Sequence, residues 1–128
     1  MSTIKADNVS NLAGSSTTSM NNVVNGSAKA WVNFNGVTIS IRASYNVSSI
    51  IDEDIGIYTI VFATPMPDAN FASCIMLGRD AYNIDIHGAI DPFILPTASS
   101  LRLRTAFLSQ VPTSNYADLP RICVSVFR

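Results

Sequence analysis

The stretch AKAWVNFNGVTISIRASYNVSSIIDEDIGIYTIVFATPMPDANF, residues 28–71, holds the only tryptophan of the chain and its longest alternating runs of apolar and polar residues. Every second residue is apolar in residues 29–34 and again in residues 37–44, which is the period of a strand with one buried face. Between them lies Asn35-Gly36, and both residue types accept the positive φ of a tight turn. We therefore predict that these two segments form a β-hairpin. The residues expected on its buried face are Ala30, Val32, Phe34, Val37, Ile39, Ile41 and Ala43.

The remaining strands follow from shorter runs of the same kind. Residues 57–64 are apolar on both faces, which is typical of a strand in the middle of a sandwich or at a subunit contact. The Pro-Met-Pro-Asp segment at 65–68 cannot continue a central strand, and residues 71–78 are expected to return as the partner of residues 57–64. Further strands are predicted at 45–51, 79–87 (Tyr82, Ile84 and Ile86 inward), 101–109 (Leu101, Leu103, Thr105 and Phe107 inward) and 121–128, with a turn at 52–56 and loops at 88–100 and 110–120.

This pattern predicts the fold class. Short strands separated by turn signals, with no helix of convincing length, indicate an all-β chain. We expect residues 28–128 to form an antiparallel β-sandwich, jelly-roll-like, of about seven to nine strands.

Residues 1–27 have a different composition, mostly Ser, Thr, Asn and Gly. Residues 2–9 alternate weakly and are expected to pair as a strand against a partner. Residues 10–27 contain too few apolar groups to offset the entropy lost on ordering, so they form a linker or an arm that orders against other chains. We therefore expect an extended N-terminal arm, used for attachment or assembly, ahead of the sandwich.

Charge excludes several classes of protein. Charged residues make up 13% of the chain, where about 25% is usual, and the formal net charge is −1 with no basic run. A nucleic-acid partner is therefore not expected, and weak repulsion between copies favours association.

No stretch of about 18 apolar residues exists, so no membrane span is predicted. Residues 1–11 lack the basic start and apolar block of a signal peptide.

The two cysteines, Cys74 and Cys123, are too few for a disulfide scaffold. Both fall inside predicted strands, where a buried thiol behaves as a small apolar residue. We expect two free, buried thiols.

No catalytic or metal-binding constellation emerges. His87 is the only histidine, and no nucleophile motif accompanies it, so a strand-end or interface position is expected. The acids Asp52, Glu53 and Asp54 lack the spacing of a calcium loop and are interpreted as a solvated turn. Nothing in the sequence pairs Asp80, Asp85 and Asp91 at the separation that a glycosidase needs. Arg102 and Arg104 are assigned to an exposed strand face. The alternatives are that they bind an acidic ligand or Asp residues of a neighbouring subunit. We therefore predict neither enzymatic activity, nor a metal, nor a cofactor.

Aromatic residues supply the remaining candidates. The rings of Trp31, Tyr45, Tyr58 and Tyr82 are suited to stacking on sugars, but packing in the core or at an interface is the preferred interpretation. We assign Trp31, Tyr58 and Phe62 to an interface between subunits. The exposed aromatic is expected to be Tyr116, in the loop at 110–120, and we assign Asn115, Tyr116 and Asp118 to a contact with a host surface.

Three segments in order carry a family resemblance: AKAWVNFNG (28–36), IRASYNVSSI (41–50) and YTIVFATPMPDANFA (58–72). Together they resemble a domain near the C-termini of tail-fibre-like and other virion proteins of tailed bacteriophages. The start MSTIKADNV is also similar to the starts of short phage fibre proteins. The turn IIDEDIGIYT is more apolar than in that family, and the arm is far shorter than a fibre shaft.

The resemblance implies a structural protein of the phage particle, made in the host cytoplasm. It implies a short tail fibre or a tail-tip component whose knob is a homotrimer, attached to other virion proteins through residues 1–27. The loops at 88–100 and 110–120 would then face a host surface glycan or protein. Three alternatives stay open. The first is a purely architectural protein, such as a capsid decoration, a head fibre or a neck adaptor. The second is a hydrolase or esterase of host surface glycans, and the third is a lectin-like module outside any virion.

Overall fold

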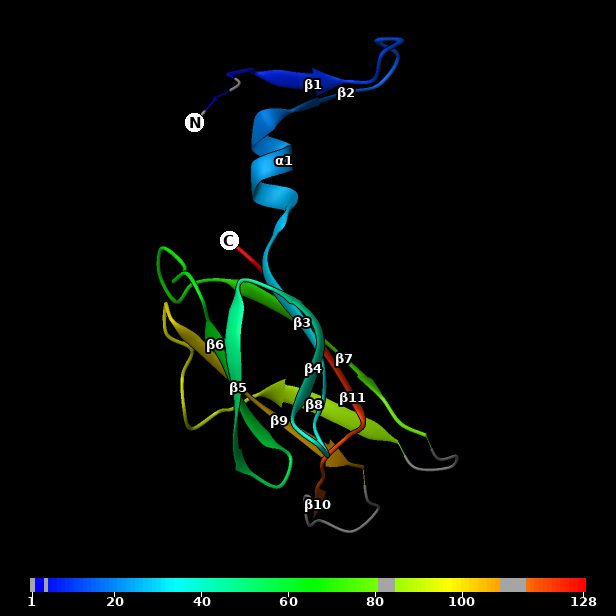
Figure 1. Cartoon of the computed structure of the whole chain (residues 1–128), viewed down its shortest axis with the longest axis vertical. Helices are drawn as coiled ribbons and strands as arrows, with labels where there is room; N and C mark the ends of the chain where they lie inside the picture. The colour runs from blue at the N-terminus through cyan, green and yellow to red at the C-terminus, as the bar shows by residue number, and fades with distance from the viewer. Residues whose placement is uncertain (1, 4, 81–84, 109–114) are drawn as a thin grey trace.

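The computed structural model describes residues 2–3, 5–80, 85–108 and 115–128. Two parts are visible in Figure 1, an N-terminal arm and a two-sheet sandwich that begins at Ala28 and that we call the knob. Strands make up 55% of the described residues and helix 6%. The prediction of an antiparallel, all-β sandwich of seven to nine strands is confirmed, because the described residues of the knob contain the nine strands β3 to β11.

The first sheet has four antiparallel strands in the order β4-β3-β11-β7. Their bounds are β4 Ser40–Tyr45, β3 Ala28–Asn35, β11 Arg121–Phe127 and β7 Ala72–Gly78. The second sheet has five strands. In it β6 lies between β5 and β9, and both β8 and β10 also pair with β9. Their bounds are β5 Val47–Asp54, β6 Ile57–Phe62, β9 Ser100–Phe107, β8 Ile86–Ile90 and β10 Asn115–Tyr116.

The hydrophobic core lies between the two sheets. Alternate residues of β3, β6, β9 and β11 point into it, as the period-two pattern predicted. The rings of Phe34, near the end of β3, and Tyr58, near the start of β6, meet edge to face with centroids 5.4 Å apart and so join the two sheets. The buried members are Ala30, Val32, Phe34, Tyr58, Ile60, Phe62, Met66, Leu101, Leu103, Leu119, Ile122, Val124 and Val126.

The hairpin predicted around Asn35-Gly36 is confirmed as the β3–β4 pair. Its turn is held by Asn35, whose Oδ1 accepts the backbone N–H of Val37 at 2.9 Å. The prediction that residues 37–44 have a buried face is wrong for β4, however, because every residue of β4 is exposed, Ile41 included. The strand lies at the edge of its sheet, so one flank has no neighbouring strand to cover it.

Two pairing and turn predictions are also wrong. Residues 71–78 do form a strand, but β7 pairs with β11 in the first sheet and not with β6. The acids Asp52, Glu53 and Asp54 are the last residues of β5 and not a turn, because β5 pairs with β6 as far as Asp54.

The segment at 88–100 is not wholly a loop. Its first three residues continue β8, which pairs with β9 from Ile86 to Ile90. The loop proper is therefore residues 91–99. Of the residues predicted inward in the preceding strand, Ile86 is half-buried, while Tyr82 and Ile84 lie outside the described residues.

The cysteine prediction is half right. Both thiols are free, but Cys74 is exposed and Cys123 is only half-buried. In β7 and β11 the core-facing positions are held by residues such as Ile75 and Val124, so the alternate positions of both cysteines face outward.

The arm has more regular structure than its sequence predicted. Strands β1 (Asn8–Ser10) and β2 (Thr17–Ser19) form a two-stranded antiparallel ladder, and helix α1 (Met20–Gly26) follows directly. Ser19 caps the helix, because its hydroxyl accepts the N–H of Asn22 at 3.2 Å. No described residue of the arm is buried. Among the described residues, no helix is long and apolar enough to cross a membrane.

Candidate functional site

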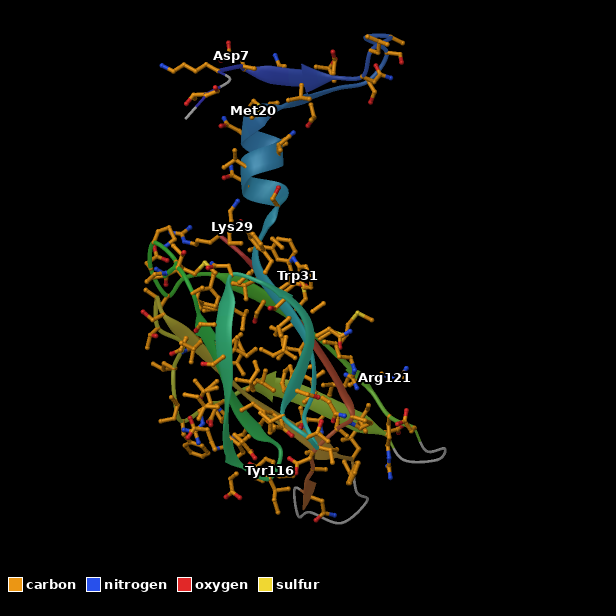
Figure 2. All side chains as sticks on the ribbon, in the orientation of Figure 1. Asp7, Met20, Lys29, Trp31, Tyr116 and Arg121 are labelled. Atoms are coloured by element: carbon orange, nitrogen blue, oxygen red, sulfur yellow. The ribbon has the colours of Figure 1, made fainter. Side chains whose placement is uncertain are left out.

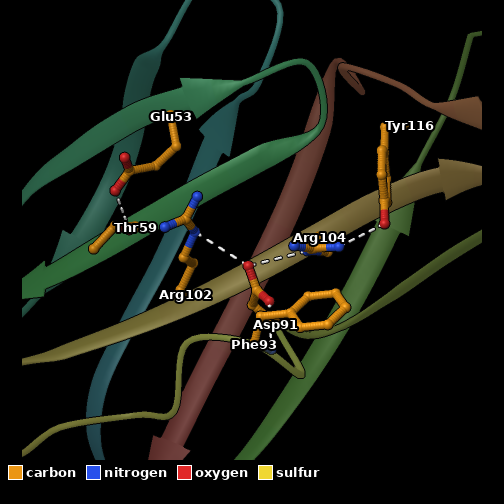
Figure 3. Close-up of polar contacts among 7 residues, drawn as sticks. All are labelled: Glu53, Thr59, Asp91, Phe93, Arg102, Arg104 and Tyr116. Atoms are coloured by element: carbon orange, nitrogen blue, oxygen red, sulfur yellow. Dashed lines mark hydrogen bonds and ion pairs between the residues drawn. The ribbon is translucent and has the colours of Figure 1, made fainter.

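Charged and aromatic side chains gather on the face of β9 that points away from the core. The group consists of Asp91, Phe93, Arg102, Arg104 and Tyr116, which we call the arginine cluster (Figure 3). Arg102 and Arg104 alternate with the core residue Leu103, so both side chains point away from the core. The other three come from the residues after β8 and from β10.

Asp91 is the centre of the cluster and is fully buried. Its N–H donates to the carbonyl oxygen of Arg102 at 2.9 Å, which fixes the chain as it leaves β8. Its Oδ2 lies 3.2 Å from Nε of Arg102 and 3.0 Å from Nε of Arg104. Its Oδ1 accepts the N–H of Phe93 at 2.8 Å. A buried carboxylate is thus paired with two cations and hydrogen-bonded, as burial of a charge requires.

These contacts set the ionisation of the carboxylate. Burial by itself raises the pKa of Asp91, but the Phe93 N–H and the two guanidinium groups outweigh it and hold that pKa below its usual value. Asp91 is therefore charged at neutral pH, and one negative charge faces two positive charges.

Arg104 extends the cluster toward β10. Its Nη1 donates to the hydroxyl oxygen of Tyr116 at 2.6 Å. Its guanidinium carbon lies 4.9 Å from the ring centroid of Phe93 and 5.2 Å from that of Tyr116, within the range of cation–π contact. Burial lowers the pKa of Arg104, but hydrogen bonds to Asp91 and Tyr116 outweigh this and raise it.

One acid lies at the β5 side of the cluster. The Oε1 of Glu53 accepts a hydrogen bond from the hydroxyl of Thr59 at 2.6 Å, and Thr59 is the residue of β6 directly opposite Arg102. Figure 3 shows Glu53 on this side and Tyr116 on the other, with the arginines between them.

The three residues assigned to host contact have different positions. Asn115 and Tyr116 are exposed on β10, and Tyr116 belongs to the arginine cluster. Asp118 is half-buried, and its Oδ1 accepts the N–H of Gly56 at 2.7 Å and the hydroxyl of Tyr58 at 2.6 Å. These bonds hold the segment before β11, and the assignment of Asp118 to a host contact stays a prediction.

The interface assignment is corrected in the same way. Tyr58 and Phe62 are buried inside the knob, so neither side chain can reach a second subunit. Trp31 is 39% exposed on the outer face of the first sheet and remains available.

Other sequence candidates do not assemble into a site. His87 is exposed on β8, and Asp80 makes an exposed ion pair with Arg121 at 3.5 Å. Within the described ranges, no group of three or more His, Cys, Asp or Glu side chains could hold a metal ion.

A pocket of about 400 Å³ opens beside the arm, between the start of β3 and the segment after β6. Both of its cations already have partners. The ammonium of Lys29 donates to the carbonyl oxygen of Val24, and Arg128 makes an ion pair with Asp68 at 2.6 Å.

Sequence reasoning missed the association of Asp91 and Phe93 with the two arginines. Arg102 and Arg104 were placed on an exposed face, but both are largely covered by the residues after β8. One signal was present in the sequence: two arginines on one strand face need a counter-charge, and Asp91 was the nearest unassigned acid in the adjoining loop.

In comparisons with known proteins, no protein-family model, no curated protein and no solved structure matches the chain.

Proposed function

We propose that the chain is a structural virion protein of a tailed bacteriophage, a short tail-fibre or tail-tip component. Its knob forms a homotrimer and contacts the host surface, and residues 1–27 attach it to other virion proteins. The proposal is supported by the three ordered segments that resemble phage fibre proteins, and by the organisation of arm and knob described above.

The arm is the observation that carries the proposal. It has regular structure, yet none of its described residues is buried and its apolar side chains Val9, Leu12, Val23 and Val24 are exposed. A seven-residue helix and a two-stranded ladder are marginal in water without a covering partner. Figure 1 shows the arm projecting from the knob. Such an arm acquires its stability from other chains, as expected of an attachment segment.

The trimer contact is assigned to the surface of the first sheet that points away from the core, which we call the outer face. One row across its four strands is Tyr45, Trp31, Ser125 and Cys74, and the next is Ala43, Asn33, Cys123 and Met76. None of these eight residues is charged; Arg42 adjoins them and donates from Nη1 to Asn33 at 3.3 Å. Exposed aromatic and sulfur-containing side chains without charge are typical of interface centres.

Host contact is assigned to the end of the knob away from the arm. Figure 2 shows Tyr116 at this end, with Met20 and Asp7 of the arm at the other. A particle that holds the arm therefore presents Tyr116 outward.

Antibodies against the knob, imaged by electron microscopy on intact phage particles, test the proposal. Labelling at the tail tip or on short fibres supports it. Labelling spread over the capsid or at the neck favours an architectural decoration or adaptor protein instead. Particles that contain none of the protein overturn the virion role, and removal of residues 1–27 is expected to abolish incorporation while the knob still folds.

A further inference from the structure

We propose that the arginine cluster binds an acidic sugar, with Arg102 and Arg104 as the anion-binding pair and Phe93 and Tyr116 as flanking aromatic surfaces. The inference deepens the proposed host contact and rests on it only for the source of the sugar. The binding chemistry itself depends on the cluster alone.

The first step is charge. Asp91 carries one negative charge against the two positive charges of the arginines, and the one further acid drawn beside them in Figure 3 is Glu53, held by Thr59. Both ion pairs run through Nε, the inner nitrogen of the guanidinium fork. Figure 3 shows the two Nη nitrogens of Arg102 directed away from Asp91. The outer edge of this fork matches the two oxygens of a carboxylate or phosphate group.

The second step is preorganisation. The side chains of Arg102 and Arg104 are 22% and 18% exposed and are fixed by a carboxylate that is itself fully buried. A free surface arginine loses rotamer entropy when it binds a ligand, whereas these two have already lost most of it on folding. This difference separates the cluster from exposed pairs such as Arg121 with Asp80.

The third step is the aromatic surface. Phe93 is 77% exposed although it follows a fully buried residue by only two positions. The Asp91 carboxylate holds its backbone in place through the Phe93 N–H, so the ring is presented by an anchored turn. Tyr116 is 39% exposed on the other side of Arg104. Two exposed rings beside a cation fit a ligand with both apolar C–H faces and a negative charge, which describes an acidic sugar better than a simple anion.

Glu53 sets the orientation of the ligand. Its carboxylate is held by Thr59 on the β5 side of Arg102 and repels an anion approaching from there. Glu53 therefore favours neutral hydroxyl groups over a second negative charge on that side of the ligand.

Titration of the full-length protein in low-salt buffer tests the inference, with binding followed by saturation-transfer NMR and calorimetry. The probes are glucuronic acid, glucose 6-phosphate, glucose and inorganic phosphate. Glucose is expected to bind at least about tenfold more weakly than the acidic sugar, because it lacks the charge-assisted hydrogen bonds. Preference for glucuronic acid identifies a sugar carboxylate as the ligand, and preference for glucose 6-phosphate identifies a sugar phosphate.

Two variants locate the site, and a third variant serves as the control. Arg102→Gln leaves Asp91 paired with Arg104 and is expected to weaken binding about tenfold. Phe93→Ala changes an exposed ring, leaves the core intact and is expected to weaken binding about fivefold. Val37→Ala shortens an exposed apolar side chain in the turn after β3, in the other sheet, and is expected to leave binding unchanged.

Four results overturn the inference: no binding of either acidic sugar, equal binding of glucose, inorganic phosphate binding as tightly as glucose 6-phosphate, or unchanged affinity in both variants. Because the assay needs no phage particle, its failure leaves the antibody labelling result intact, and failure of the labelling leaves the sugar assay intact.

Discussion

The hydroxyl of Tyr58 donates to Oδ1 of Asp118 at 2.6 Å and so ties the start of β6 to the segment that leads into β11. The same carboxylate oxygen accepts the N–H of Gly56 at 2.7 Å. Burial first, and then the nearby Asp118 carboxylate, raise the pKa of Tyr58 above its ordinary value, so the hydroxyl stays a donor. This contact joins the second sheet to the strand that lies in the middle of the first.

Replacement of Tyr58 by Phe tests that tie. The ring keeps its edge contact with Phe34, but the bond to a charged acceptor is lost, and we expect the free energy of unfolding to fall by about 2 kcal/mol. Urea denaturation measures it. The matched control is Tyr45→Phe on an exposed ring, which is expected to change stability by less than about 0.5 kcal/mol. Equal effects in the two variants would show that the Asp118 contact contributes nothing.

Replacement of Asp91 by Asn tests the centre of the arginine cluster. The amide no longer balances two largely covered guanidinium groups, and we expect a loss of about 3 kcal/mol in the free energy of unfolding. The control is Asp68→Asn, which removes the exposed partner of Arg128 and is expected to have little effect. If the two variants are equally stable, Asp91 does not anchor residues 91–99.

Acid stability follows from the same carboxylate. The pKa of Asp91 is lower in the folded protein than in the unfolded chain, so the unfolded chain binds its proton first as pH falls. The stabilisation is fully present above the unfolded value of about 3.9 and is lost as pH falls from there through the folded pKa. Melting temperatures measured from pH 7 to pH 2.5 are expected to fall steeply below about pH 4 and to fall less in Asp91→Asn. Parallel curves for the two proteins would contradict the assigned pKa direction.

Gly56 is required by both its conformation and its surroundings. Its φ is +66°, and an added Cβ would lie 2.4 Å from the carbonyl oxygen of Thr105. We expect Gly56→Ala to lower the free energy of unfolding by about 3 kcal/mol, combining left-handed strain with overpacking. Gly14 has nearly the same φ, +67°, with nothing within 4 Å of an added Cβ, so Gly14→Ala is expected to leave the unfolding of the knob unchanged. A Gly56→Ala protein as stable as the parent would show that the β5–β6 turn can relax.

The parts of this fold that the sequence could predict are those set by local pattern. Alternation identified Ala30, Val32 and Phe34 as core residues, and Asn35-Gly36 marked the hairpin. The partner of β7 could not be found this way, because residues 72–78 bear the same pattern whether they pair with β6 or with β11. Strand order depends on the whole set of pairings. The exposure of β4 was missed for the same reason, since an edge strand and a central strand can share one sequence pattern.

The arginine cluster shows where sequence reasoning stopped. The strand pattern predicts that Arg102 and Arg104 face solvent, because charged side chains are seldom covered. Their covering depends on Asp91. The burial of Asp91 depends in turn on β8, which continues into the segment that the sequence pattern predicts as a loop. Helix α1 was missed because Asn and Val favour helix weakly, and only the Ser19 cap marks its start.

The mass of the full-length protein in solution, from light scattering after gel filtration, tests the proposed trimer most directly. The expected value is close to three times the chain mass of 13.8 kDa. Met76→Glu, which places a charge on the outer face, is expected to shift the mass toward that of one chain. Phe93→Ala, in the loop after β8, is expected to leave the mass unchanged. A clean monomer for the parent protein would contradict the trimeric knob and leave the outer face without its assigned partner.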